Sequence, residues 1–251
     1  MNFDAARWTP FGTYITAEES WGAQAQRYGR LFELSNPVAA AAGTGNLVHA
    51  NAVARVAHEG LAFDRNSNLH DTDELNGGRI CRYRSATPIH GSNYCSGGTN
   101  AVLRVGDGDT ANATGAFNWV PFTTAAGTCW AGAVTITDPN GVTSNDGRAT
   151  TSTAAFKGTG YQRSEDLEIQ TRANGDQLLY VTATPSHMVY SISLQTNQIQ
   201  AFVTRAQVVR ADAGRPGRDR FDRASAPPQL IGAARQSPGA LACPFFLIRA
   251  L

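Results

Sequence analysis

The sequence predicts an all-β protein, and more specifically a β-propeller, from two observations. The first is composition: 25 glycines and 11 prolines are spread among many Thr, Asn and Ser residues, which is typical of short strands joined by tight turns. The second is a strand–turn–strand plan that recurs in units close to the roughly 40–50 residues of one propeller blade. A meander of unrelated hairpins is the alternative that this pattern leaves open.

Two units carry the repeat most clearly, and each starts with a glutamate. Both turn at Asn-Ser-Asn or Asn-Gly, and both alternate apolar with polar residues, as half-buried strands do. A weaker third unit lies near the N-terminus. The predicted segments are 59–64, 66–69 and 77–83 in one unit, 165–170, 174–181 and 188–194 in the second, and 13–19 and 28–34 in the third.

Two stretches depart from this plan. Residues 84–161 are rich in Gly, Thr and Asn, and we expect a long insertion there, with one strand pair around 133–138 and a turn at 139–141. That one blade lies inside the insertion is the alternative left open. Residues 205–251 have no period and carry a net charge of +5 from Thr204 onward, against −4 for the first 203 residues. We therefore predict a propeller region at 1–204 and an irregular basic tail at 205–251, either an out-of-frame reading or a disordered linker.

Composition and charge narrow the classes of partner. No run of about 18 apolar residues exists, so we expect no membrane span. A net charge of +1 gives no reason to expect nucleic acid. The first residues lack an apolar signal core, which indicates either a cytoplasmic protein or a missing N-terminus. The four cysteines have no C-x-x-C spacing, which argues against a zinc ribbon. Cys81 and Cys95 could pair in an exported protein, or all four could be unrelated thiols.

Carboxylates open or close the predicted strands. In a propeller, a carboxylate at the start of each innermost strand would point into the central channel. Several converging there would form a hard-oxygen site for Ca²⁺ or iron, although a single acidic pair is usually a solvated turn. The residues concerned are Glu18, Glu19, Glu59, Asp73, Glu74, Glu165 and Asp166.

Three motifs resemble the PhoX-type alkaline phosphatases and their short relatives. They are Thr9-Pro-Phe-Gly-Thr-Tyr-Ile-Thr-Ala-Glu-Glu19, Ala57-His-Glu-Gly60 and Gln162-Arg-Ser-Glu-Asp166, and the resemblance runs from about Arg7 to Thr204. It implies an exported, periplasmic or extracellular β-propeller that hydrolyses small phosphomonoesters at a cluster of iron and calcium ions.

The resemblance also implies residue roles. Glu19, Glu59 and Glu165 match metal ligands, and Arg163 matches the arginine that grips the phosphate. A guanidinium can hold two phosphate oxygens at once, whereas the alternative for Arg163 is a salt bridge at the end of a strand. Glu18, His58, Glu74 and Asp166 are further candidates, as metal ligands or as residues packed behind them.

The chain departs from the family at three points. The iron-binding cysteine before the first motif and the late Pro-Asp-Asn motif are absent, and Ser164 stands where the family has proline. We therefore expect calcium rather than iron, and a chain truncated at both ends. Two rival functions stay open: a calcium-dependent propeller lactonase or phosphotriesterase, and a non-enzymatic exported binding module with structural calcium.

Overall fold

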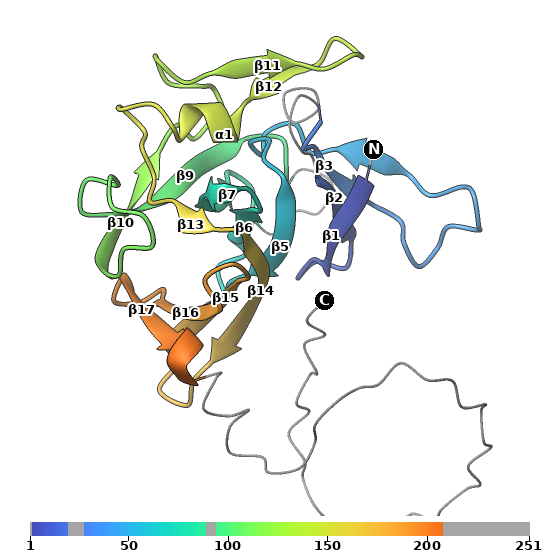
Figure 1. Ribbon diagram of the computed structural model, residues 1–251. Coiled ribbons are helices and arrows are strands. Elements are labelled where there is room, and N and C mark those ends of the chain that lie inside the picture. The colour runs from blue at the N-terminus through green and yellow to red at the C-terminus, as the bar shows by residue number, and fades with distance from the viewer. Residues whose placement is uncertain (1, 20–27, 89–93, 208–251) are drawn as a thin grey trace, which may run out of the picture. The chain divides into compact units, whose positions relative to one another are not determined.

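The described part of the chain is almost entirely β-structure. The computed structural model describes residues 2–19, 28–88 and 94–207, and Figure 1 shows strands throughout them, with a short helix α1 (Gly147–Thr150) capped by Asp146. The expected all-β class is confirmed. The predicted basic tail lies outside the described residues from 208 onward, and so does Cys243.

Three antiparallel meanders make up most of the strands, and in each of them consecutive strands pair as neighbours. The first contains β1 (Asn2–Trp8), β2 (Tyr14–Glu19), β3 (Leu31–Leu34) and β4 (Leu47–His49). The second contains β5 (His58–Phe63), β6 (Leu69–Asp73), β8 (Ile80–Ser85), β9 (Gly98–Val105) and β10 (Gly115–Pro121). The third contains β14 (Ser164–Thr171), β15 (Gln177–Ala183), β16 (Met188–Ser193) and β17 (Gln198–Val203).

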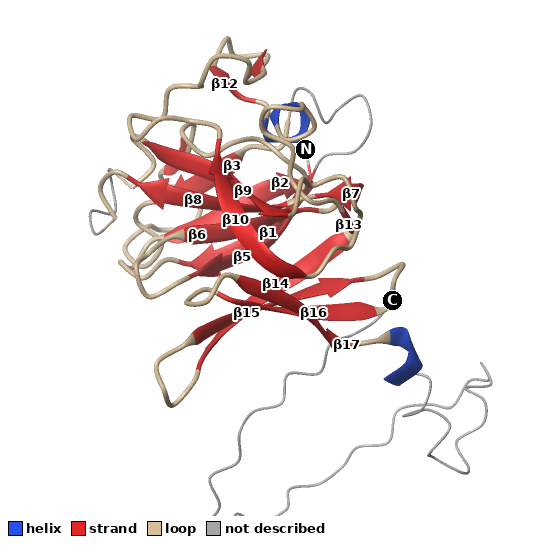
Figure 2. Cartoon of the chain, turned by 90° about the vertical axis from the view of Figure 1, so that its left-hand side faces the viewer, coloured by secondary structure: helices blue, strands red, loops and turns tan. Residues whose placement is uncertain are grey.

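The second and third meanders join into one nine-stranded sheet. β10 pairs with β9 along five residues, and its first two residues, Gly115 and Ala116, pair with Ile199 and Gln198 of β17. The outermost strands of this sheet, β5 and β14, pack against each other, so the sheet is nearly closed and barrel-like. Figure 2 shows the third meander running below the second.

Two small sheets complete the described body. β11 (Thr135–Thr137) and β12 (Thr143–Asn145) form the hairpin that the sequence predicted around 133–141. β7 (Asn76–Gly78) pairs with β13 (Tyr161–Gln162) and so brings the segment before β14 beside the second meander.

The structure corrects two sequence-based expectations. Residues 84–161, expected to be an insertion, contribute β9 and β10 to the nine-stranded sheet. β9 and β10 join the sheet by pairing with β8 and β17, and the Gly- and Thr-rich composition of the segment does not reveal this pairing. In addition, the N-terminal unit begins one strand earlier than predicted, because the strand expected at 13–19 is the second of its meander and β1 precedes it.

The first hairpin turn of each meander has the same backbone form. In each turn, the N–H of the first residue donates to the C=O of the residue four positions later. The first residues are Thr9, Asp64 and Arg172. The residue at the fourth position has a positive φ: 87° at Gly12, 59° at Ser67 and 85° at Gly175. Glycine adopts this conformation without a steric penalty, and the shared turn fixes the same register in all three hairpins.

Apolar side chains fill the space between neighbouring meanders. One cluster lies between the second and third, with Leu103, Phe117, Leu179 and Tyr190 among its buried members. Another lies between the first and second, and a third surrounds Cys81 and Phe122. Cys81, Cys95 and Cys129 are free thiols.

The first strands of the meanders contact one another without forming a continuous ladder. Gly60 in β5 lies so close to β14 that an added Cβ would be 2.5 Å from Leu167 N and 2.7 Å from Glu165 O. The Thr72 hydroxyl bridges the same contact, since it accepts from Gly60 N (3.0 Å) and donates to Glu165 O (3.0 Å).

Arg7 of β1 ties all three first strands together. Its Nε donates to Leu61 O of β5 at 2.7 Å, and its Nη2 donates to Leu167 O of β14 at 2.9 Å. Both carbonyls belong to strand edges that no neighbouring strand pairs, so Arg7 and Thr72 satisfy backbone groups that would otherwise be buried without partners.

Gly60→Ala should separate β5 from β14 and lower the free energy of unfolding by about 1–3 kcal/mol, as overpacking does. Urea unfolding followed by far-UV circular dichroism measures the change. Gln170→Ala, at an exposed position of β14, is the matched control and should change stability by less than about 0.5 kcal/mol. Equal stability of Gly60→Ala and the wild type would show that the close contact is absent.

Candidate metal centre

Each meander carries a β-bulge at the same place in its first strand. The register against the second strand shifts between Phe3 and Ala6 in β1, between His58 and Leu61 in β5, and between Ser164 and Leu167 in β14. In each case two residues oppose one, which bends the strand and turns a side chain. The first residue of each bulge is acidic: Asp4, Glu59 and Glu165.

The end of each second strand carries a further oxygen-bearing side chain at an equivalent position. Glu19 is the last residue of β2, and Glu74 and Thr184 directly follow β6 and β15. In the second and third meanders this residue's N–H donates to the carbonyl two positions before the bulge, from Glu74 to Ala57 and from Thr184 to Arg163. The same local geometry therefore places two oxygen-bearing side chains per meander at one end of the inner strands.

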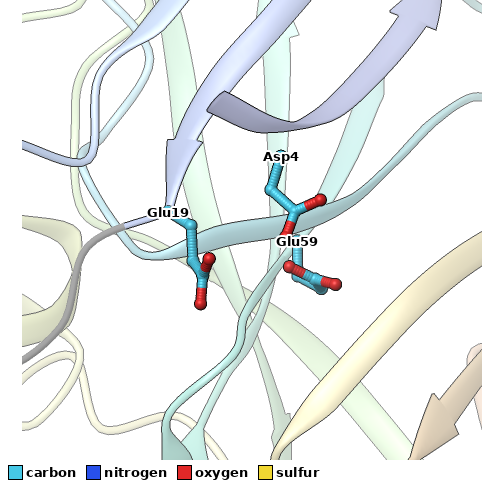
Figure 3. Close-up of side chains that lie close together, drawn as sticks. All are labelled: Asp4, Glu19 and Glu59. Carbon is cyan, nitrogen blue, oxygen red and sulfur yellow. The ribbon is translucent and has the colours of Figure 1, made fainter. Parts of the chain in front are cut away.

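These side chains form two overlapping groups. Ligand atoms of Asp4, Glu19 and Glu59 lie within 4.8 Å of one another, and so do those of Glu59, Glu74 and Glu165. Glu59 belongs to both groups. Figure 3 shows the carboxylates of Asp4, Glu19 and Glu59 gathered in one space, with each residue coming from a different strand. We call Asp4, Glu19, Glu59, Glu74 and Glu165 together the carboxylate cluster.

Burial and mutual repulsion make the carboxylate cluster costly to ionise. Burial raises the pKa of Glu59 to about 8, with further contributions from the charges of Asp4, Glu74, Glu165 and Glu19. Burial also raises the pKa of Glu74 to about 7, helped by the Glu19 carboxyl and opposed by Arg163. Glu59 Oε2 and Glu74 Oε2 are buried and accept no hydrogen bond from the described residues. Two buried acceptors without donors fit a bound cation.

Arg163 lies at the edge of the carboxylate cluster. Its guanidinium forms ion pairs with Glu74 and, at 3.6 Å, with Glu165. Glu165 also accepts a hydrogen bond from the Thr184 hydroxyl at 2.6 Å. The Arg163 backbone has a φ of 44°, which is uncommon for a residue with a side chain. The strand-end salt bridge expected as one alternative for Arg163 is therefore present.

The structure does not bring Glu18 into the carboxylate cluster. Strand alternation turns it away from its neighbour Glu19, and its fully buried carboxylate accepts from Arg30 Nε (2.9 Å) and Nη2 (2.7 Å). Arg30 also pairs with Asp138 in the turn between β11 and β12, at 3.5 Å. Glu18 therefore serves a structural ion-pair network.

His58 and Asp166 also lie outside the two groups. His58 is fully buried, with its Nδ1 3.5 Å from Asp71 Oδ2. Asp166 is the second residue of the β14 bulge and is exposed. Asp73, which precedes Glu74, is held by Arg148 through Nε (3.0 Å) and Nη2 (2.6 Å).

Asp4 is the one member of the cluster that the sequence did not single out. The predicted N-terminal unit began at residue 13, so the strand that carries Asp4 was not counted. Its signal is the pattern Phe-Asp-Ala-Ala, an acidic residue followed by a small one, which matches Glu59-Gly60 at the corresponding bulge. Aligning β1 with β5 would have found it.

Comparison of the chain with family models, curated proteins and solved structures found no match. Among the described residues, no helix has the length and apolar character needed to cross a membrane. What the centre can do chemically therefore has to be argued from its own side chains, whose carboxylate oxygens could hold a cation.

The metal-free protein should lose stability as the pH rises from about 5 to about 8. The unfolded chain releases the Glu59 and Glu74 protons near the ordinary value of 4.5, whereas the folded protein retains them to about 8 and about 7. Across this window the folded state binds more protons, so the free energy of unfolding falls, and it levels off above pH 8. Urea unfolding of metal-stripped protein at each pH measures the slope.

Glu59→Gln should flatten this slope by removing one of the two titrating groups. Asp166→Asn is the control, because this neighbouring acid is exposed and should leave the slope unchanged. A slope that is the same in Glu59→Gln as in the wild type would show that folding does not raise the pKa of Glu59.

Proposed function

We propose that the carboxylate cluster binds calcium and forms the centre of a metal-dependent hydrolase of phosphate monoesters. The observation that carries the proposal is the convergence of equivalent bulge residues from three meanders, with oxygen atoms within 4.8 Å of one another. A solvated acidic turn needs no such convergence. The buried oxygens of Glu59 and Glu74 that accept no hydrogen bond give independent support.

The ligand chemistry favours calcium over iron or zinc. Both groups consist of carboxylates and contain neither cysteine nor histidine among the described residues. Calcium takes six to eight oxygen ligands in flexible geometry, whereas softer metals prefer nitrogen or sulfur. The five carboxyl groups and the nearby Thr184 hydroxyl suit such an oxygen cage. Iron stays a weaker candidate because the cysteine ligand of the PhoX-type family is absent.

Arg163 is the proposed substrate-binding residue. Cations on the carboxylate cluster would compete with the guanidinium for Glu74 and Glu165, and would free its N–H groups for a phosphate. When bound, the metal would supply charge neutralisation for the phosphate oxygens and activation of the attacking water. Arg163 would then orient the phosphate and stabilise the charge that develops on its oxygens.

We also propose that the three meanders are blades of a β-propeller related to the PhoX-type phosphatases. Supporting this are the meander order, the contact among the first strands β1, β5 and β14, and the repeated bulge and turn geometry. The resemblance of the sequence motifs points the same way, and with it goes a periplasmic or extracellular location. The lactonase or phosphotriesterase alternative would use the same cluster on a different substrate.

A structural calcium site without turnover is the second candidate. The ion pairs of Arg163 with Glu74 and Glu165 favour it, because a guanidinium engaged in this way stabilises the fold without any substrate. In this case calcium binding would be retained and hydrolysis would be absent.

Calcium should raise the melting temperature of metal-stripped protein by about 5–10 °C when present at about 100 times its Kd, since it binds only the folded state. Glu59→Gln and Glu165→Gln should lose this rise, and Asp166→Asn should keep it. Scanning fluorimetry with Ca²⁺, Mg²⁺, Mn²⁺ and Fe³⁺ measures the effect and the preference. Identical melting curves in chelator and in calcium would remove the proposed metal site.

Arg163→Lys should lower phosphate-monoester hydrolysis by at least about tenfold while the calcium-dependent rise in melting temperature persists. Lysine keeps the charge but cannot hold two phosphate oxygens with one planar group. Arg84→Lys, at an exposed position of β8, is the control. Phosphotriester and lactone substrates assayed in parallel distinguish the alternative enzymes. Unchanged hydrolysis in Arg163→Lys would end the phosphate role of this residue.

A further inference from the structure

A cavity lies at the opposite end of the strands that carry the carboxylate cluster. It has a volume of about 380 Å³ and is lined by the turns that follow β5, β14 and β16, together with side chains of β6, β8 and β10. Asp64, at its rim, is five residues beyond Glu59, or about 16 Å along an extended strand. The volume of the cavity falls in the range of small-molecule sites.

The acidic group of this cavity is already satisfied by the protein. Asp64 Oδ1 accepts from the backbone N–H groups of Asn66 and Asn68, both at 2.9 Å. Asp64 Oδ2 accepts from the Asn68 side chain at 2.7 Å and faces His70 Nε2 at 3.3 Å. Burial pushes the Asp64 pKa upward, but the hydrogen bonds from His70 and Asn68 outweigh it and the net pKa is lowered. Asp64 is therefore an ionised carboxylate with a structural role, because its hydrogen bonds hold the turn after β5.

The basic group of the cavity has no such partner. Arg82 is half-buried, and its guanidinium stacks on the Trp119 ring at 4.6 Å. Within the described residues it forms no ion pair and no hydrogen bond, and its Nε is buried. The buried Arg30 and the partly buried Arg148, by contrast, are paired with Glu18 and Asp73. Stacking on an aromatic face leaves the N–H edge of a guanidinium available for a planar acceptor.

A histidine and a second guanidinium lie beside Arg82. His70 lies directly opposite it in the β6–β8 ladder, and the fully buried His70 Nδ1 has no hydrogen-bond partner among the described residues. Arg65 lines the same cavity and is held by Gln177, whose Oε1 accepts from Arg65 N (2.9 Å) and Nε (3.2 Å). Two guanidiniums therefore line a cavity whose carboxylate, Asp64, already has hydrogen-bond partners on both of its oxygens.

We propose that this cavity binds a small oxyanion, a carboxylate or a phosphate, on the N–H edge of Arg82 with Arg65 at its mouth. An oxyanion would supply the acceptors that Arg82 lacks and would form charge-assisted hydrogen bonds, the strong kind in a partly buried site. The site is separate from the carboxylate cluster and does not depend on the hydrolase proposal.

Isothermal titration of the full chain with malonate and with inorganic phosphate tests the proposal. The protein is first stripped of metal on a chelating resin and kept free of soluble chelator, because chelators are themselves polycarboxylates. At least one anion should bind at concentrations up to about 10 mM, and the comparison of the two shows which oxyanion the site prefers. Absence of binding by both would overturn the proposal.

Arg82→Gln should weaken binding by about tenfold or more. Arg84→Gln removes the same charge from the same face of β8 at an exposed position outside the cavity lining, and should change binding by less than about twofold. Should Arg82→Gln fail to fold, Trp119→Phe replaces it: binding should then quench the wild-type tryptophan emission, and this quenching should be lost in the variant. Equal affinity in Arg82→Gln, or quenching retained in Trp119→Phe, would place the anion elsewhere.

Discussion

The close approach of β5 and β14 at Gly60 is the constraint on which the rest of the structure depends. These strands are not joined by a hydrogen-bonded ladder, so Thr72 and Arg7 supply the missing partners for their backbone groups. With no side chain at Gly60, Glu59 and Glu165 come within ligand distance of each other. The fold therefore forces together carboxylates that repel each other, and a bound cation would turn that repulsion into attraction.

The strands were largely predictable from the sequence, and their long-range partners were not. Alternation of apolar and polar residues around Leu61, Leu179 and Ile192 marks segments that bury one face, a local property that a single sequence displays. The union of the second and third meanders rests on two residue pairs between β10 and β17, at Gly115 and Ala116. No local pattern encodes such a pairing, and for this reason residues 84–161 were interpreted as an insertion.

The site shows the same division between local and non-local information. Glu59 and Glu165 were predicted because each opens a strand with a clear pattern, and Glu19 because it closes one. Asp4 was missed since the bulge that aims it depends on the register against β2, which a single strand does not reveal. Glu18 could have been separated from Glu19 in advance, because adjacent residues in a strand point to opposite faces. Its buried partner Arg30 could not have been predicted from spacing.

The two ends of the inner strands carry side chains of opposite charge, and the distance between the ends limits how strongly one affects the other. Acidic groups gather at the bulges, whereas Arg65, in the turn after β5, and Arg82, in β8, line the cavity at the other end. At the roughly 16 Å that separates the two ends along β5, two unit charges interact by only about 1 kcal/mol at an effective dielectric constant of about 20, so each carboxylate has a weak effect on an anion beside Arg82. On both proposals, each end would hold a ligand of charge opposite to its own, and the ordered strands between the ends keep the acidic and basic side chains from pairing with each other directly.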